Sequence, residues 1–239
     1  KETFGRGRAA CKPLMARAGL SESFVDPALD YLAAKGAEVC FNNRLRALDL
    51  GDGQVRALDF AGATKVLDPG DQVVLAVPAW AAADLLPGLN GPQASHAIVN
   101  AHFRLTGPVP AAPPLVGLVG GTAQWVFLRD DVASVTVSAA DALAAEANEE
   151  IAMRLWPEVQ AALGLADGPL PPWRIVKEKR ATISQTPAED RRRPAPRTAW
   201  HNLVLAGDWT ATGLPATIEG SIRSGFRAAD MVVTSLSSS

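Results

Sequence analysis

The residues best placed to do chemistry lie near the C-terminus, around Gly207 and Asp208. Residues 203–206 form a continuous apolar run, which is typical of a strand buried on both faces. Gly207 ends this run where the backbone must turn sharply or approach a ligand. Asp208 follows at the carboxyl end of the strand, which is the usual ligand edge of an open α/β sheet.

A helix is predicted soon after this turn, because apolar residues recur at spacings of three and four. These residues are Ile218, Ile222, Phe226, Ala229 and Val233. We expect the unpaired N–H groups of its first turn to point back toward the Asp208 loop, where they favour negative charge. Gly220 and Gly225 each cost such a helix about 1 kcal/mol relative to alanine. A helix that carries both glycines is expected to pack very close to a neighbour.

The order of residues in this region is specific. Residues 205–210 read Leu-Ala-Gly-Asp-Trp-Thr, and residues 213–225 read Gly-Leu-Pro-Ala-Thr-Ile-Glu-Gly-Ser-Ile-Arg-Ser-Gly. The arrangement resembles the C-terminal signature of the flavin amine oxidase and phytoene desaturase superfamily. Within it, the match is closest to the squalene-associated FAD-dependent desaturases, also called hydroxysqualene dehydroxylases. The alternative is a parallel strand and helix that bind no ligand.

The resemblance implies FAD as the cofactor and gives roles to several residues. Gly207 and Asp208 would lie beside the ribityl and diphosphate part of FAD. The start of the last helix would meet the pyrimidine edge of the flavin, with the Ile218 N–H donating to the O2 position. That donor and the positive helix end would stabilise negative charge on the reduced ring. The other implied contacts in this segment are Pro215, Ala216 and Thr217.

An earlier segment matches the middle of the FAD domain in the same superfamily. Residues 36–39, Gly-Ala-Glu-Val, precede asparagines and Leu45. By position, Leu45 would use its backbone to contact the adenine, and Val77 would end a strand near the adenine side. The alternative for this region is an ordinary β-meander.

Local patterns predict the elements of this first region. A helix is expected at 24–35, with Asp26 as N-cap, Pro27 at the first position and Gly36 as C-cap. A hairpin turn is expected at 51–53. Strands are predicted at 39–41, 44–50, 55–60, 65–67 and 73–77, followed by a short helix at 79–86.

Residues 89–195 read as a second region. Strands are predicted at 97–105, 115–118, 123–128, 134–138, 173–179 and 181–185, and one long amphipathic helix at 141–163. The fold class is therefore predicted as α+β. We expect segments 1–88 and 196–239 to form a partial FAD-binding domain. We expect 89–195 to form a substrate-binding domain on a mixed or antiparallel sheet.

The composition narrows the class of protein. The net charge of −2 gives no overall field that would favour nucleic acid. Cys11 and Cys40 show no metal or disulfide spacing, and the three histidines are scattered, so no metal site is predicted. The longest apolar stretch, 73–86, is too short to span a bilayer. We expect a cytoplasmic protein, with peripheral contact at the inner face of the membrane left open.

The sequence lacks one part of the family pattern. The Gly-x-Gly-x-x-Gly unit that meets the diphosphate is missing, and Gly5-Arg-Gly7 has no strand before it. We therefore expect this chain alone to bind FAD weakly or not at all and to be inactive. Exposed sheet edges and an open apolar crevice would favour self-association. A truncated, non-catalytic fragment or interaction module is the alternative from another class.

The resemblance implies reductive dehydroxylation of an isoprenoid lipid of the hydroxysqualene type. An amine oxidase is less favoured, because the place of its cage tyrosine is taken by Thr217 and Tyr31 is far away. Phytoene or carotenoid desaturation is the third alternative. No catalytic acid or base is assigned. The nearest basic candidates, Lys177, Lys179 and Arg180, are more often surface residues.

One basic cluster has two interpretations. Arg191, Arg192 and Arg193, with Arg197 nearby, lie among three prolines. A solvated loop is the ordinary interpretation. Contact with anionic lipid head groups is the alternative.

Overall fold

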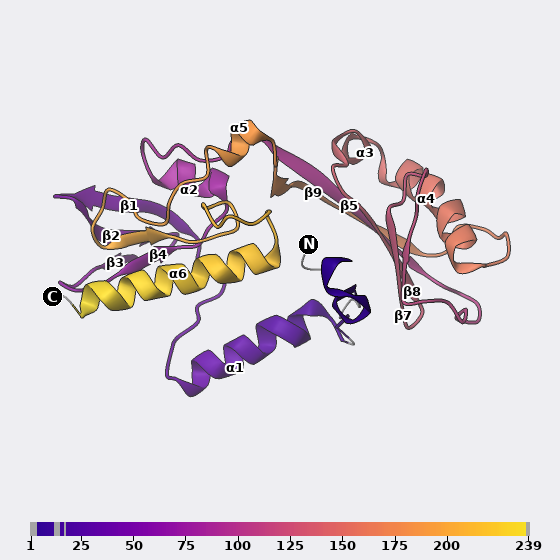
Figure 1. Cartoon of the computed structure of the whole chain (residues 1–239), viewed down its shortest axis with the longest axis horizontal. Coiled ribbons are helices and arrows are strands. Elements are labelled where there is room, and N and C mark those ends of the chain that lie inside the picture. Colours follow the sequence, from indigo (N-terminus) through magenta and orange to yellow (C-terminus); the bar gives the residue numbers. More distant parts are fainter. Residues whose placement is uncertain (1–3, 12–14, 17, 238–239) are drawn as a thin grey trace. The chain divides into compact units, whose positions relative to one another are not determined.

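A computed structural model describes residues 4–11, 15–16 and 18–237. The chain divides into two units. One comprises Lys1–Arg46 with Phe60–Ala63, and the other comprises Ala47–Asp59 with Thr64–Ser239. Helices and strands both contribute substantially, so the predicted α+β class is confirmed (Figure 1).

The smaller unit is mainly helical. A helix α1 spans Asp26–Ala34, as predicted, and Gly36 follows it with a φ of 76°, the left-handed conformation of a helix end. The N-cap prediction was wrong, because a π-helical turn at Ser21–Val25 runs directly into α1 and Val25 takes the cap position. Two 3-10 turns precede it, at Phe4–Arg6 and Arg8–Cys11. The strand predicted at 39–41 was also wrong, since these residues form no strand.

A three-stranded sheet follows in the order β1-β2-β3. Its strands are β1 (Leu45–Gly51), β2 (Gln54–Phe60) and β3 (Thr64–Val66). Asp52 and Gly53 both have positive φ, 51° and 73°. Positive φ at both central residues suits the twist of a two-residue hairpin, so the turn predicted at 51–53 is confirmed.

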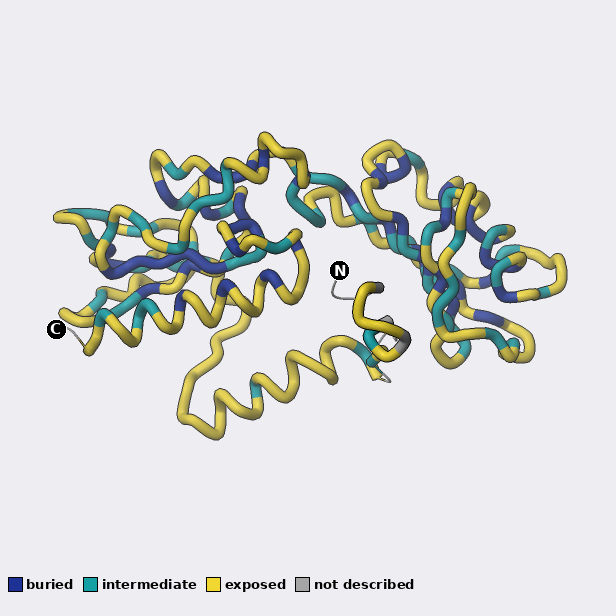
Figure 2. The backbone as a smooth tube through the Cα atoms, viewed as in Figure 1, coloured by how far each residue is buried: buried dark blue, intermediate teal, exposed yellow. Residues whose placement is uncertain are grey.

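A parallel pair of strands carries the C-terminal segment. β4 (Val73–Leu75) pairs with β10 (Leu203–Leu205), and the buried β10 appears dark blue in Figure 2. Helix α6 (Ile218–Leu236) packs on β10, where Val204, Ala206 and Ala228 form a small core. The short helix α2 spans Ala79–Leu85. The buried strand and the last helix are therefore where the sequence predicted them.

The largest core lies under a five-stranded antiparallel sheet in the order β6-β7-β8-β5-β9. The strands are β5 (Ser95–Arg104), β6 (Leu115–Gly117), β7 (Trp125–Arg129), β8 (Val132–Val137) and β9 (Trp173–Ile183). Helix α4 (Asn148–Leu163) adds Ile151, Leu155 and Val159 to the core, all fully buried. Phe103 of β5 and Trp156 of α4 pack with their rings tilted by 42° and the ring centroids 5.3 Å apart.

Two predictions in this region were wrong. The long helix at 141–163 is interrupted: α3 covers Asp141–Ala145, and the backbone is extended at Glu146 and Ala147 before α4 begins. The Lys177 amine of β9 donates to the Glu146 carbonyl in this break. The two strands predicted at 173–179 and 181–185 form one strand, because β5 offers β9 pairing partners from Phe103 to Ser95.

The last short helix, α5, covers Pro187–Asp190 and is capped by the Thr186 side chain. Its Glu189 carboxylate accepts the N–H groups of Gln93 and Ala94 at 2.7 and 3.3 Å. These two bonds tie the segment after β9 to the segment before β5. The assignment of 1–88 with 196–239 to the cofactor, and of 89–195 to the substrate, stays a prediction.

Candidate functional site

The turn after β10 is built around Gly207. Its φ is 135°, and a Cβ placed there would lie 2.5 Å from Trp209 Nε1, so a side chain at this position is excluded. The Gly207 N–H donates to Ser224 Oγ of α6 at 2.7 Å. The Trp209 indole N–H donates to the Val77 carbonyl at 2.8 Å. The ends of β4 and β10 are thus fixed to one another and to α6.

Asp208 lies at the carboxyl end of β10, as the sequence predicted. The residue is half-buried. Burial raises the pKa of its carboxyl above the usual 3.8, while the Arg193 guanidinium and the backbone N–H groups of Asp208 and Trp209 oppose this rise. The site therefore presents an acidic group that has lost part of its hydration and retains a nearby cation.

The start of α6 leaves a hydrogen-bond donor available. The Thr217 hydroxyl caps the helix by accepting the Gly220 N–H at 3.1 Å, and the Thr217 carbonyl accepts the Ser221 N–H at 3.0 Å. Within the described residues, no hydrogen bond is found for the Ile218 N–H. The Ile218 residue is 56% exposed, so an acceptor from outside the chain could reach it.

The first turn of α6 packs directly on the Asp208 turn. A Cβ built on Gly220 would lie 3.0 Å from the Pro215 carbonyl oxygen and 3.7 Å from Asp208 Cβ. The expectation that the helix packs closely is therefore confirmed at Gly220. It was wrong at Gly225, where nothing in the described part of the chain lies within 4 Å of such a Cβ.

The structure brings together most of the predicted site residues. Val77, Gly207 and Asp208 meet at the ends of the parallel strands, and Gly220 joins this turn to Pro215. Ala216 is buried, while Pro215, Thr217 and Ile218 are exposed. Leu45 is the first residue of β1 and belongs to the smaller unit. The role of each residue toward a cofactor stays a prediction.

Asp208 and Trp209 line a small cavity of about 80 Å³ together with Trp80 and Arg180. The Arg180 guanidinium carbon lies 4.0 Å from the centroid of a Trp80 ring, which is cation–π stacking. The other basic candidates lie elsewhere: Lys177 is bonded to a backbone carbonyl, and Lys179 is exposed. Arg180 is therefore the candidate that borders the Asp208 turn.

The sequence did not reveal the role of Arg193. Its side chain is 6% exposed, so both interpretations of the arginine cluster were wrong for this residue. Its guanidinium donates to the loop that follows Asp208. Arg191 is exposed, and Arg192 lies 3.9 Å from the Glu189 carboxylate. Adjacent arginines carry no pattern that separates the buried one, because its acceptors are backbone carbonyls 15 to 21 residues away.

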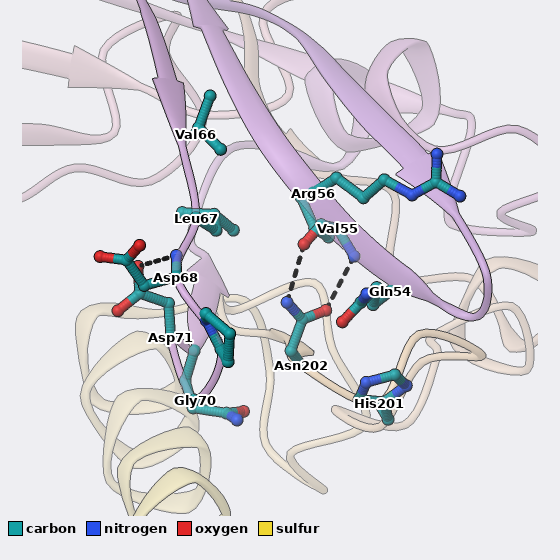
Figure 3. A pocket seen from close by; sticks show the side chains of 12 residues that line it. Gln54, Val55, Arg56, Val66, Leu67, Asp68, Gly70, Asp71, His201 and Asn202 are labelled. Carbon is teal, nitrogen blue, oxygen red and sulfur yellow. Dashed lines mark hydrogen bonds between the residues drawn. The ribbon is translucent and has the colours of Figure 1, made fainter.

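A larger cavity of about 440 Å³ lies at the other end of the parallel strands (Figure 3). Gln72 and Asn202, which line it, precede β4 and β10, whereas Asp208 follows β10. The Asn202 side chain accepts the Val55 N–H at 2.8 Å and donates to the Val55 carbonyl at 2.9 Å. This amide therefore joins β2 to the parallel pair, and the cavity is separate from the Asp208 turn.

The histidines have ordinary partners. His96 Nδ1 lies 2.7 Å from the Asp141 carboxylate, and His102 Nδ1 lies 2.9 Å from the Ser134 hydroxyl. Burial, followed by the charge of Arg174, lowers the pKa of His102. Among the described residues, no group of three or more His, Cys, Asp or Glu side chains could hold a metal ion.

Comparison with known sequences finds one matching family and relatives that share a single name. The family described as flavin containing amine oxidoreductase matches residues 5–233. Hydroxysqualene dehydroxylase of Rhodopseudomonas palustris is 51% identical over 234 residues, and that of Zymomonas mobilis is 46% identical over 234 residues. Each alignment covers 98% of this chain and 56% of the relative. The chain thus spans little more than half the length of these curated relatives.

Solved structures share the fold. A candidate protoporphyrinogen oxidase from Exiguobacterium sp. 255-15 superposes with a TM-score of 0.67 at 16% identity, over 97% of this chain and 55% of that one. Cyclohexylamine oxidase from Brevibacterium oxydans gives a TM-score of 0.57 at 13% identity, over 81% and 48% of the two chains. At these identities the likeness concerns the fold alone.

Proposed function

The chain belongs to the flavin-containing amine oxidoreductase family, and we propose that it forms part of an FAD-dependent oxidoreductase acting on an isoprenoid lipid. The relatives named hydroxysqualene dehydroxylase, 46% to 51% identical, support a reductive dehydroxylation of the hydroxysqualene-to-squalene type. Because the chain spans 56% of those relatives, the proposed activity is that of a whole protein. This chain contributes the Asp208 turn and the start of α6.

The observation that carries the proposal is the Ile218 N–H, which is available beside the Asp208 turn. FAD, when bound, supplies the hydride chemistry. The Ile218 N–H would donate to the flavin O2 position, and the electropositive end of α6 would favour negative charge there. Asp208 would meet the ribityl or diphosphate portion. An exposed, unpaired donor next to a half-buried carboxyl fits a ligand that presents both acceptors and hydroxyl groups.

Thr217 argues against amine oxidation. The resemblance implies a tyrosine at this position in amine oxidases, as part of an aromatic cage for the amine. Here the Thr217 hydroxyl is used within the chain, as the acceptor for Gly220 and as a donor to the Pro215 carbonyl at 3.1 Å. The amine oxidases among the solved structures support the fold and not the substrate.

We further propose that the protein meets its lipid substrate as a cytoplasmic protein in peripheral contact with the inner face of the membrane. In the described part of the chain, no helix has the length and apolar character needed to cross a bilayer. Exposed Phe24 and Val25, in the π-helical turn that precedes α1, support contact with an apolar surface.

The proposed donor can be removed without breaking the helix. Proline is favoured at the first position of a helix, and Thr217 has φ −150° and ψ 163°, an extended conformation that a following proline accepts. Ile218→Pro therefore deletes one N–H, and Ile218→Ala is the matched control that keeps it. Both changes would be made in a fusion protein. In it, this chain is joined to the part of the Rhodopseudomonas palustris hydroxysqualene dehydroxylase that lies outside the alignment.

We expect Ile218→Pro to weaken FAD binding about 10-fold, the effect of losing one hydrogen bond of about 1.4 kcal/mol, while Ile218→Ala binds normally. Calorimetric titration measures both affinities. The unsubstituted protein should convert hydroxysqualene to squalene and should leave putrescine unchanged. Equal FAD affinity in the two variants would contradict the assigned donor, and turnover of the amine alone would contradict the substrate class.

A further inference from the structure

Arg193 gathers more acceptors than its place in an arginine run suggests. Its Nε donates to the Thr210 carbonyl at 2.9 Å, and Nη1 donates to the Leu214 carbonyl at 2.6 Å. Its Nη2 donates to the Asp208 carbonyl at 2.6 Å and to the Thr212 hydroxyl at 2.8 Å. Nη1 also lies 3.2 Å from the Asp190 carboxylate. One buried guanidinium therefore contacts four residues of a single loop.

That loop, residues 208–214, has few backbone bonds within itself. Thr212 donates its N–H to the Thr210 carbonyl at 2.7 Å, and Ala211 donates to the Pro194 carbonyl at 2.8 Å. Buried carbonyl groups without donors are costly, so their partner decides whether the loop keeps its shape. Thr210 and Thr212 are both buried, and Arg193 supplies the donors. Of the side chains outside the loop that bond to it in the described structure, Arg193 contacts the most residues, whereas Arg227 reaches only the Ala211 carbonyl.

The two ends of this loop are the two halves of the candidate site. Arg193 holds the Asp208 carbonyl at one end and the Leu214 carbonyl at the other, immediately before Pro215. We propose that Arg193 is a positioning residue that sets the place of Asp208 relative to the Ile218 N–H. The role of these two groups toward a cofactor rests on the proposed function, whereas the fixing of the loop does not.

The shape of the guanidinium explains why lysine would not replace it. Arginine presents five N–H donors in a rigid planar fork, whereas the lysine ammonium is a point charge with three donors. Acceptors at Thr210, Leu214 and Asp208 require donors at three separated atoms. A lysine would keep the positive charge and lose the arrangement of hydrogen-bond donors. The Arg193→Lys variant therefore separates the effect of the charge from the effect of the hydrogen bonds.

The charge of Arg193 also acts on the Asp208 carboxyl, where it opposes the rise in pKa caused by burial. Other charged groups in the surroundings are already engaged. Across the cavity, Arg180 stacks on Trp80, and Asp190 pairs with Arg193 itself. On α6, the neighbouring groups are Glu219, paired with Arg223, and Arg227, which donates to the Ala211 carbonyl.

The test compares Arg193→Gln and Arg193→Lys with Arg191→Gln, a matched change at the exposed neighbour, in the full chain. The Asp208 titration is followed by carboxyl carbon NMR, and the exchange rates of the 208–214 amides by hydrogen exchange. We expect Arg193→Gln to raise the Asp208 pKa further, and both Arg193 variants to exchange at least 10-fold faster. The Arg191 variant should match the parent in both measurements.

Thr212→Val serves if the Arg193 variants do not fold, because it removes one acceptor, keeps the volume and should accelerate exchange in the same loop. Unchanged exchange and an unchanged Asp208 titration in the variants would overturn the proposal. A further measurement separates the role of Arg193 in the loop from the proposed flavin site. We expect Arg193→Lys to lower the FAD affinity of the fusion protein about 10-fold. If the loop loosens and FAD affinity does not fall, the loop role holds and the proposed flavin site is wrong.

Discussion

Asp208 shows at the level of one residue how the burial of a charged group opposes stability. Burial raises the pKa of its carboxyl above 3.8, so the folded chain binds this proton more tightly than the unfolded chain does. Its contribution to stability is therefore complete below pH 3.8 and is lost as the pH rises through the folded pKa. At neutral pH the partly desolvated carboxylate favours unfolding.

Asp208→Asn should reverse this effect, because the amide keeps the shape and carries no charge. We expect a Tm about 2 °C higher than that of the parent at pH 7, a small value because the group is half-exposed. The difference should shrink as the pH falls and disappear below about pH 3.8, where the parent carboxyl is protonated. Calorimetric scans between pH 3 and pH 8 measure it. A lower Tm for the variant at pH 7 would contradict the stated cause.

At the level of elements, α6 has a capped N-terminus and two glycines whose surroundings differ. Thr217 caps the helix, Gly220 packs against the Pro215 carbonyl, and Gly225 faces open space in the described structure. The helix-breaking tendency of Gly220 is therefore balanced by a close approach that a methyl group would disturb. No such approach explains Gly225.

This contrast predicts that the same substitution, glycine to alanine, stabilises the protein at Gly225 but not at Gly220. Gly225→Ala should raise the free energy of unfolding by about 1 kcal/mol, the helix propensity of alanine over glycine. Gly220→Ala should lack that gain, because its Cβ would lie 3.0 Å from a backbone oxygen that α6 cannot easily displace. Urea unfolding of the two variants and the parent measures the difference. Equal stabilisation by both changes would show that the contact at Gly220 is not restrictive.

The elements also show what the sequence could reveal. The hairpin at 51–53, strand β10 and helix α6 were predictable, because turn residues and apolar spacing are local signals. The break between α3 and α4 and the continuity of β9 were missed, because both depend on partners distant in sequence. Arg193 was missed for the same reason: its four acceptors lie in a loop that the local pattern does not connect to it.

At the level of the whole molecule, α6 has an apolar face without a partner in the described structure. Its buried residues are Gly220, Ser224 and Ala228, whereas Phe226 and Val233 are 69% and 62% exposed. In the sheet as described, β4 pairs with β10 alone. An open strand edge beside an exposed apolar helix face favours association with another polypeptide.

The chain on its own should therefore self-associate. As a separate expectation carried from the sequence, we predict that it binds FAD with a Kd above about 1 µM, a binding free energy of roughly 8 kcal/mol or less. Phe226→Asp should shift the population toward monomer, and Val119→Asp, at a fully exposed loop position, is the matched control. Light scattering after size-exclusion chromatography measures mass, and fluorescence titration measures FAD affinity. A monomer at high concentration, or sub-micromolar binding, would contradict these expectations.

The Trp209 indole has a use beyond its part in the turn. It is 2% exposed, touches the position where Gly207 excludes a side chain, and donates to the Val77 carbonyl. Light emission from an indole depends on the polarity around it, and this ring lies at the point where both parallel strands end. The chain therefore carries an intrinsic optical reporter at the junction of β4, β10 and α6. Because Trp209 is one of six tryptophans, the difference in emission between the protein and a Trp209→Phe variant isolates the signal of that junction.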